Sequence, residues 1–245
     1  MSKAFNSING ANWFETVDQD YLKGVRNPSL GNRHLPINHG DVLEMFQMKA
    51  QAQGMTLGDA SGYLSPEQDK FIYVAEVNAN IHMTFAIGFI NFNDRSRSFT
   101  GLAGEKVFTC SNCQFGGVFA PSKTRHTLNV EDRLDTKVDA IFDQYNAYEA
   151  ELKKEQGFLT ETQIDDAKLG KVLVEMGREK VFGATNIMRI IEEYDKPTFN
   201  DGDAPANGWR LNNAVTHTLK KIKNPIQNID SGNHARQVIL KVLGY

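Results

Sequence analysis

The chain has 245 residues, of which 40% are hydrophobic and 23% charged, a composition typical of a globular protein and not of a disordered one. No apolar run reaches the roughly 18 to 20 residues that a membrane span needs, and the first residues lack the apolar core of a signal peptide. We therefore expect a cytoplasmic protein that does not bind a membrane. The net charge of −3 argues against a protein that coats nucleic acid by charge alone.

The charge is unevenly distributed along the chain. Residues 209–245 carry six Lys or Arg against one acid, Asp230, so this tail has a charge of +5. The six cations are Arg210, Lys220, Lys221, Lys223, Arg236 and Lys241. Such a tail can be a phosphate-facing patch, and its ordinary interpretation is the solvated face of terminal helices.

The first element predicted along the chain is a helix over residues 38–53. Asn38 or Asp41 can cap its start, an apolar stripe follows, and Gly54 can end it in a left-handed conformation.

Strands follow this helix. Residues 71–77 and 81–92 are rich in β-branched and aromatic side chains, and in the second segment apolar residues alternate with small or polar ones. Residues 94–97 form a turn before another strand, which includes Phe99 and 106–110. The segment from about 71 to 113 therefore indicates an antiparallel meander.

Helices are predicted for the rest of the chain. Apolar side chains spaced by three or four residues indicate one helix from 129 to about 152. Gly157 interrupts it, and Thr160 to Gln163 provide a capping box for a second helix that extends to about Phe182.

A third helix begins near Thr185 and is closed by Pro197. Residues 197–208 contain too many helix breakers for regular structure and predict a loop. Two last helices follow over 209–222 and 231–243, parted by Pro225.

Strands that precede helices predict an α+β fold, with an N-terminal antiparallel β meander packed against a C-terminal set of helices. We expect a single domain over residues 33–245, sheet-rich over 60–128 and helical over 129–245. Residues 1–32 have no assignment.

Catalytic machinery is not recognisable in the sequence. Cys110 and Cys113 have the spacing of zinc ligands, but the chain has no second ligand pair, and small buried cysteines fit the end of a strand equally well. The glycine pairs near 101–104 and 116–117 lack the context of a phosphate-binding loop and are expected in turns. We therefore predict no metal site and no cofactor, and the absence of a recognisable catalytic motif leaves enzyme activity an open question that leans against an enzyme.

Two groups of polar residues are candidates for a binding site. Asn213 and His217 share one face of a predicted helix with Trp209, where they form a ligand site or, as in many folds, a network that ties the helix to the sheet.

Arg125 and His126 precede the long helix, where a cation beside free backbone N–H groups attracts anions such as phosphate. The alternative is a surface ion pair between Arg125 and Glu131 or Asp132.

Five segments in register resemble the phage- and plasmid-borne family catalogued as domain of unknown function 932. The segments are Arg33 to Asn38, Ala60 to Leu64, Phe108 to Asn112, Arg125 to Thr127 and Trp209 to His217. They span roughly residues 33–243. The chain departs from the family in a shortened N-terminal opening and at Cys113, where a threonine is more typical, which argues that the Cys pair is incidental.

The resemblance implies a mobile-element protein, from a phage, that acts in the host cytoplasm in the context of DNA replication and recombination. Our first hypothesis is therefore single-stranded nucleic-acid binding or annealing, with Phe or Tyr of an exposed sheet stacking on bases. The candidate binding residues are Arg95, Arg97, Asn112, Arg125, His126, Asn213, His217, Lys220, Lys221 and Lys223.

The alternative is a protein-binding module that inhibits or redirects a host factor. The chain before residue 209 carries more acids than bases, and this acidic part suits a partner surface. An oligomer is compatible with either function. A hydrolase that uses Asn112, Arg125, His126 and His217 is a third hypothesis, although no general base is identifiable from the spacing. Convergence of Asn112, His126, Asn213 and His217 on one open pocket would indicate a ligand site.

Overall fold

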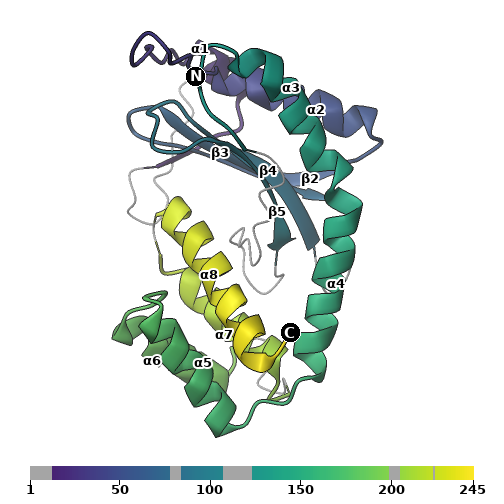
Figure 1. The fold of residues 1–245 in the computed structure, drawn as a ribbon, viewed down its shortest axis with the longest axis vertical. Helices are drawn as coiled ribbons and strands as arrows, with labels where there is room; N and C mark the ends of the chain where they lie inside the picture. The colour runs from purple at the N-terminus through teal and green to yellow at the C-terminus, as the bar shows by residue number, and fades with distance from the viewer. Residues whose placement is uncertain (1–12, 78–83, 107–122, 199–204, 223) are drawn as a thin grey trace. The chain divides into compact units, whose positions relative to one another are not determined.

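The computed structural model describes residues 13–77, 84–106, 123–198, 205–222 and 224–245 (Figure 1). Contacts divide the chain into two compact units. The first contains residues up to 103 together with 119–148, and the second contains 104–118 together with 149–245. The single domain expected over 33–245 stays a prediction, because it requires that the two units unfold together.

The predicted α+β class is confirmed. Among the described residues one antiparallel sheet has the strand order β1-β2-β3-β4-β5-β6, which is the predicted meander extended by strands at both ends. The strands are β1 (Phe14–Glu15), β2 (Leu57–Leu64), β3 (Lys70–Val77), β4 (Thr84–Phe92), β5 (Phe99–Lys106) and β6 (Lys123–Thr124).

The strands β3 and β4 form the centre of the sheet. They pair from Lys70 opposite Phe92 to Val77 opposite Phe85 without a register shift. Both faces of β4 are buried from residue 85 to residue 92. The strand β2 was not predicted, because its sequence from Leu57 to Leu64 has two glycines and no β-branched residue.

One face of the sheet is covered by helices α2 (His39–Ala52) and α3 (Val130–Asp143), which lie side by side (Figure 1). Phe46 of α2 is fully buried, with ring centroids 5.6 Å from Tyr73, 5.5 Å from Phe89 and 4.9 Å from Phe142. This aromatic cluster joins the sheet to both helices. Burial of such large rings is a major apolar contribution to the stability of a unit of this size.

The predicted boundaries of α2 are confirmed. The Asn38 side chain accepts hydrogen bonds from the backbone N–H groups of Gly40 and Asp41, as an N-cap does. Gly54 follows the helix with φ +69°.

The segment before residue 33 is part of the first unit from Trp13 onward. The strand β1 pairs with β2, and the short helix α1 (Gln19–Gly24), capped by Asp18, packs on α2. Lys23 of α1 and Glu44 of α2 form an ion pair of 2.9 Å. Residues 13–24 thus complete the edge of the sheet and its helical cover.

The second unit is built from helices. These are the larger part of α4 (Tyr145–Glu161), then α5 (Asp166–Arg178), α6 (Ala184–Asp195), α7 (Gly208–Leu219) and α8 (Pro225–Leu243). Their apolar faces form one core that includes Leu159, Val172, Met176, Ile190 and Leu211, each fully buried.

Three predicted helix boundaries in this region were wrong. The helix expected over 129–152 is divided at Gln144 into α3 and α4, and α4 continues through Gly157 to Glu161. Thr160 does not begin a helix, because its hydroxyl donates to the carbonyl of Gln156 within α4 (2.8 Å). Asp165 caps α5 in its place, accepting from the N–H of Lys168.

The last helices also begin earlier than expected. Pro225 is the first residue of α8 and not a break before it, since a proline is well accommodated where the helix needs no N–H donor. Asn224 caps this helix, and Asn207 caps α7 in the same way.

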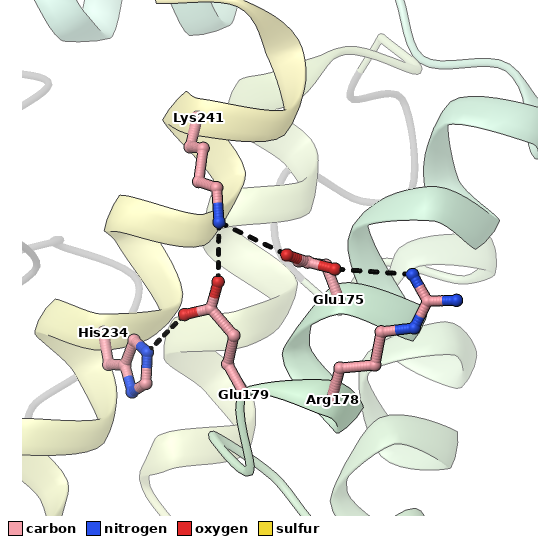
Figure 2. Close-up of polar contacts among 5 residues, drawn as sticks. All are labelled: Glu175, Arg178, Glu179, His234 and Lys241. Carbon is pink, nitrogen blue, oxygen red and sulfur yellow. Dashed lines mark hydrogen bonds and ion pairs between the residues drawn. The ribbon is translucent and has the colours of Figure 1, made fainter.

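An ion-pair network connects α5 to α8 on the surface of the second unit (Figure 2). Lys241 lies 2.8 Å from Glu179 and 3.3 Å from Glu175, and His234 lies 2.6 Å from Glu179. Arg178 approaches Glu175 less closely, at 3.7 Å. The lysine is largely exposed, so these pairs position the helices more than they stabilise them.

We expect Gly88→Ala to lower the free energy of unfolding by about 1 to 3 kcal/mol or more. A Cβ at position 88 would lie 1.9 Å from the carbonyl oxygen of Tyr73, which is backbone of the paired strand and cannot yield. Gly24→Ala is the matched control in the same unit, since its Cβ would meet nothing within 4 Å. Urea denaturation followed by circular dichroism measures both, and equal stability of the two variants would contradict the tight approach of β3 and β4.

Candidate anion-binding pocket

A pocket of about 880 Å³ lies in the first unit, where three chain segments meet. The segments are the loop 30–34, the turn between β4 and β5, and residues 125–127 before α3. Its lining residues are Leu30, Gly31, Asn32, Arg33, His34, Arg95, Ser96, Arg97, Ser98, Arg125, His126 and Thr127. Four arginines and two histidines thus share one pocket, and no carboxylate lines it.

The positive charge of the pocket is poorly compensated. Arg33 and Arg125 are exposed, and neither side chain makes a hydrogen bond or ion pair with another residue that the structure describes. The nearest acid in the sequence, Asp94, forms a 3.1 Å ion pair with Lys70. The guanidinium groups of Arg33 and Arg125 therefore have their donors available to an anion.

The turn between β4 and β5 presents Arg95 in an unusual backbone conformation. Its φ of +68° is in the left-handed region, which non-glycine residues seldom adopt. The Asp94 carboxylate stabilises the turn by accepting hydrogen bonds from the N–H and the hydroxyl of Ser96 (3.0 and 2.6 Å). The Arg95 guanidinium donates to the carbonyl of Leu30 (3.0 Å), so the turn is joined to the opposite wall of the pocket.

The loop 30–34 is closed by its own side chains. Gly31 has φ +121°, a conformation available to glycine, and the chain turns there. The backbone N–H of Leu30 donates to His34 Nδ1 (3.0 Å), and the hydroxyl of Ser29 donates to the carbonyl of His34. His34 then pairs with Thr127 in an antiparallel β-bridge, which places the two histidine segments side by side.

A buried asparagine, Asn93, connects the segments beneath the pocket. Its Oδ1 accepts from the N–H of Ile37 (2.9 Å), and its Nδ2 donates to the Ile37 carbonyl (2.9 Å) and to Asn27 Oδ1 (2.6 Å). The same Oδ1 lies 3.0 Å from His126 Nδ1. One amide therefore holds the end of β4, the segment before α2 and the segment before α3 together.

His34 and His126 lie with parallel rings at a centroid distance of 6.0 Å. Their exposed fractions are only 5% and 7%, and Nε2 of each ring has no hydrogen-bond partner among the residues that the structure describes. Burial lowers the pKa of His126 to about 4, assisted by the neighbouring His34, and burial together with Arg95 lowers the pKa of His34. Both rings are therefore neutral near pH ~7 in the absence of a ligand.

Four of the predicted site residues, Arg95, Arg97, Arg125 and His126, converge in this pocket. The alternative ion pair of Arg125 with Glu131 or Asp132 does not form within the described chain. Asn112, Lys223, Cys110 and Cys113 lie outside the described residues.

Asn213 and His217 belong to α7 of the second unit, where His217 has a structural partner. His217 Nδ1 lies 2.7 Å from Glu193 Oε2, and the other carboxylate oxygen accepts from the N–H and hydroxyl of Thr198 (2.8 and 2.7 Å). Asn213 is buried. The His217 contact ties α7 to α6 and not to the sheet, as the structural interpretation had expected, and Oδ1 of Asn213 has no partner among the described residues.

The basic tail is largely occupied by intramolecular contacts. Arg210 donates to the carbonyls of Tyr194 (2.6 Å) and Asp195 (2.9 Å), Arg236 forms a 2.7 Å ion pair with Glu155, and Lys241 belongs to the network in Figure 2. Lys220 and Lys221 follow the end of α7, and Lys221 is exposed. The tail therefore does not present its six cations as one phosphate-facing patch.

Two residues that line the pocket, Arg33 and His34, and Asn93 beneath it were absent from the candidates chosen from the sequence. A usable signal existed, because the dipeptide Arg-His occurs at 33–34 and again at 125–126 in a chain with six histidines. The structure pairs these two dipeptides across the His34–Thr127 bridge. Asn93 had a weaker signal, as a polar residue that ends an apolar strand.

Comparison with known proteins returns no match: no family model fits the chain, and no curated protein or solved structure is significantly similar to it. Within the described ranges, no group of three or more His, Cys, Asp or Glu residues could hold a metal ion. No helix in the part of the chain that the structure describes is both long and apolar enough to span a membrane.

We expect the stability of the first unit to fall between pH 6.5 and 4. Burial lowers the pKa of His39 to about 4 as well as that of His126, from an ordinary value of 6.5. The unfolded chain thus binds more protons in this window, and the stabilisation present above pH 6.5 is lost as the pH falls, by up to about 3 kcal/mol per histidine.

Chemical denaturation at several pH values measures this dependence. His126→Asn retains a donor at the position of Nδ1 for the bond to Asn93 but has no titrating ring, so its pH slope should be about half as steep over this window. Identical slopes for variant and wild type would show that His126 is not buried in its neutral form.

We expect His217→Ala to destabilise the second unit by about 1 to 3 kcal/mol, because it leaves the buried Glu193 carboxylate without its imidazole partner. Lys221→Ala, an exposed position that follows the same helix, should change the free energy of unfolding by less than about 0.5 kcal/mol. A double-mutant cycle with Glu193→Gln isolates the coupling, and a coupling near zero would rule out the structural role.

Proposed function

We propose that the protein binds single-stranded nucleic acid through the phosphates of the strand, with the four-arginine pocket as the point of contact. The observation that supports this most directly is the gathering of Arg33, Arg95, Arg97 and Arg125 around one concavity without a lining carboxylate. Guanidinium groups match phosphate oxygens in geometry and charge, and two of the four have no partner within the described chain.

The form of the site favours an unpaired strand over a duplex. A pocket of about 880 Å³ is large enough for a nucleotide-sized group. A flexible single strand can place such a group inside the concavity, whereas the phosphates of a duplex lie on a stiff, convex surface. The resemblance to the phage-borne domain of unknown function 932 is compatible with this role and supports the proposal of a part in replication or recombination.

The proposal does not include base stacking on the sheet. Phe71, Tyr73, Phe89 and Phe99 are each at most 2% exposed, in contact with one another or with Phe46 of α2. These rings are core residues, so the expected aromatic platform is absent on this face. Affinity would then come mainly from phosphate contacts and depend steeply on salt.

We expect Arg125→Gln to weaken the binding of a labelled single strand by about tenfold at low salt. The slope of log affinity against log salt should be about −3 for the wild type, if all four arginines contact phosphate, and smaller in magnitude by about 0.7 in the variant. Fluorescence anisotropy over a salt series measures both quantities.

Arg178→Gln is the matched control, since it removes the same charge from an exposed position of α5 that does not line the pocket. It should leave both affinity and slope unchanged. Equal losses of affinity in the two variants would show that only the net charge of the protein matters. If micromolar wild type did not bind a single strand at about 50 mM salt, the proposal would be overturned.

A further inference from the structure

The two histidines of the pocket offer different groups to a ligand. His34 Nδ1 accepts the N–H of Leu30, so it carries no proton, and the proton of the neutral ring is on Nε2. This Nε2–H has no partner in the described part of the chain, although only 5% of the residue is exposed. His34 therefore presents an unsatisfied donor.

His126 has the opposite tautomer. Its Nδ1 faces Asn93 Oδ1, which already accepts from the N–H of Ile37 and cannot donate, so Nδ1 carries the proton. Nε2 of the neutral ring is then an acceptor, and it too is buried without a partner within the described ranges. The pocket thus combines four cations, one free imidazole donor and one free imidazole acceptor.

A phosphodiester satisfies only part of this set. Its non-bridging oxygens accept from guanidinium groups and from His34, but it has no hydrogen to donate to His126. A phosphomonoester has a second ionisation near pH 6, so near neutral pH it can bring a P–OH hydrogen or pass that proton to the imidazole. Both arrangements place one proton between a phosphate oxygen and His126 Nε2. With the proton on the phosphate, the group has the single negative charge of a diester, and with the proton on the imidazole it presents two negative charges to the arginines.

We propose that the pocket binds a terminal phosphate group, the phosphomonoester at the end of a nucleic-acid strand or on a mononucleotide, with one proton shared between that phosphate and His126. This inference deepens the proposed function. Arg95 is the charged group beside His34. The titratable groups beside His126 are His34 and Asp94, and Asp94 is paired with Lys70.

Competition binding with strands of one sequence tests the proposal. The strands carry a 5′-phosphate, a 3′-phosphate or hydroxyl groups at both ends, and a nucleoside monophosphate and inorganic phosphate serve as the free ligands. We expect one phosphorylated end to bind about tenfold or more tightly than the unphosphorylated strand. Equal affinity for all three strands would overturn the terminal-phosphate inference while leaving nucleic-acid binding intact.

The free ligands separate this inference from the proposed function. Binding of the nucleoside monophosphate without any strand would support the phosphate site and contradict single-strand binding. Binding of neither strand nor free phosphate would overturn both proposals.

His126→Asn provides the matched variant, because it removes Nε2 and leaves a donor for Asn93. It should abolish the preference for the phosphorylated end, so that the phosphorylated and unphosphorylated strands bind with about equal affinity. Calorimetry of the wild type in two buffers of different ionisation enthalpy is independent of any variant. Binding of the phosphorylated strand above about pH 6 should take up protons, and binding of the unphosphorylated strand should not. Equal proton uptake for both strands would contradict the shared proton.

Discussion

The pocket depends on the hydrogen bonds of one buried side-chain amide. Asn93 bonds both the N–H and the C=O of Ile37, as a neighbouring strand would, and it also reaches Asn27 and His126. An amide in this position replaces backbone pairing at a place where the sheet has ended. Without it, buried polar groups of three segments would lose their partners together, each at a cost of about 1 to 3 kcal/mol.

This arrangement explains how the protein concentrates positive charge without burying it. The buried members of the site, Asn93, His34 and His126, are neutral near pH ~7, so their burial requires hydrogen bonds and not ion pairs. The charges are on the arginine side chains, whose guanidinium groups reach solvent. The neutral buried groups hold the backbone of these arginines in place. A rigid neutral base and a charged rim together resemble a preorganised anion receptor.

The parts of the fold that the sequence predicted are those determined locally. The helix after Asn38 has its cap, stripe and terminal glycine within one short segment, and β3 and β4 have the composition of strands. The break at Gln144 and the strand β2 have no comparable local signal. The pocket could be predicted only in part, because residues 33–34 and 125–126 meet through a bridge that depends on tertiary structure.

At position 95, the stability of the fold and the binding of an anion favour different residues. A glycine would adopt a φ of +68° without the strain that an arginine bears, which is on the order of 1 kcal/mol. At this one position the best residue for the turn and the best residue for an anion are different. A library of variants selected for thermal stability alone would therefore be enriched in Gly at position 95. Its most stable members would bind the ligand most weakly.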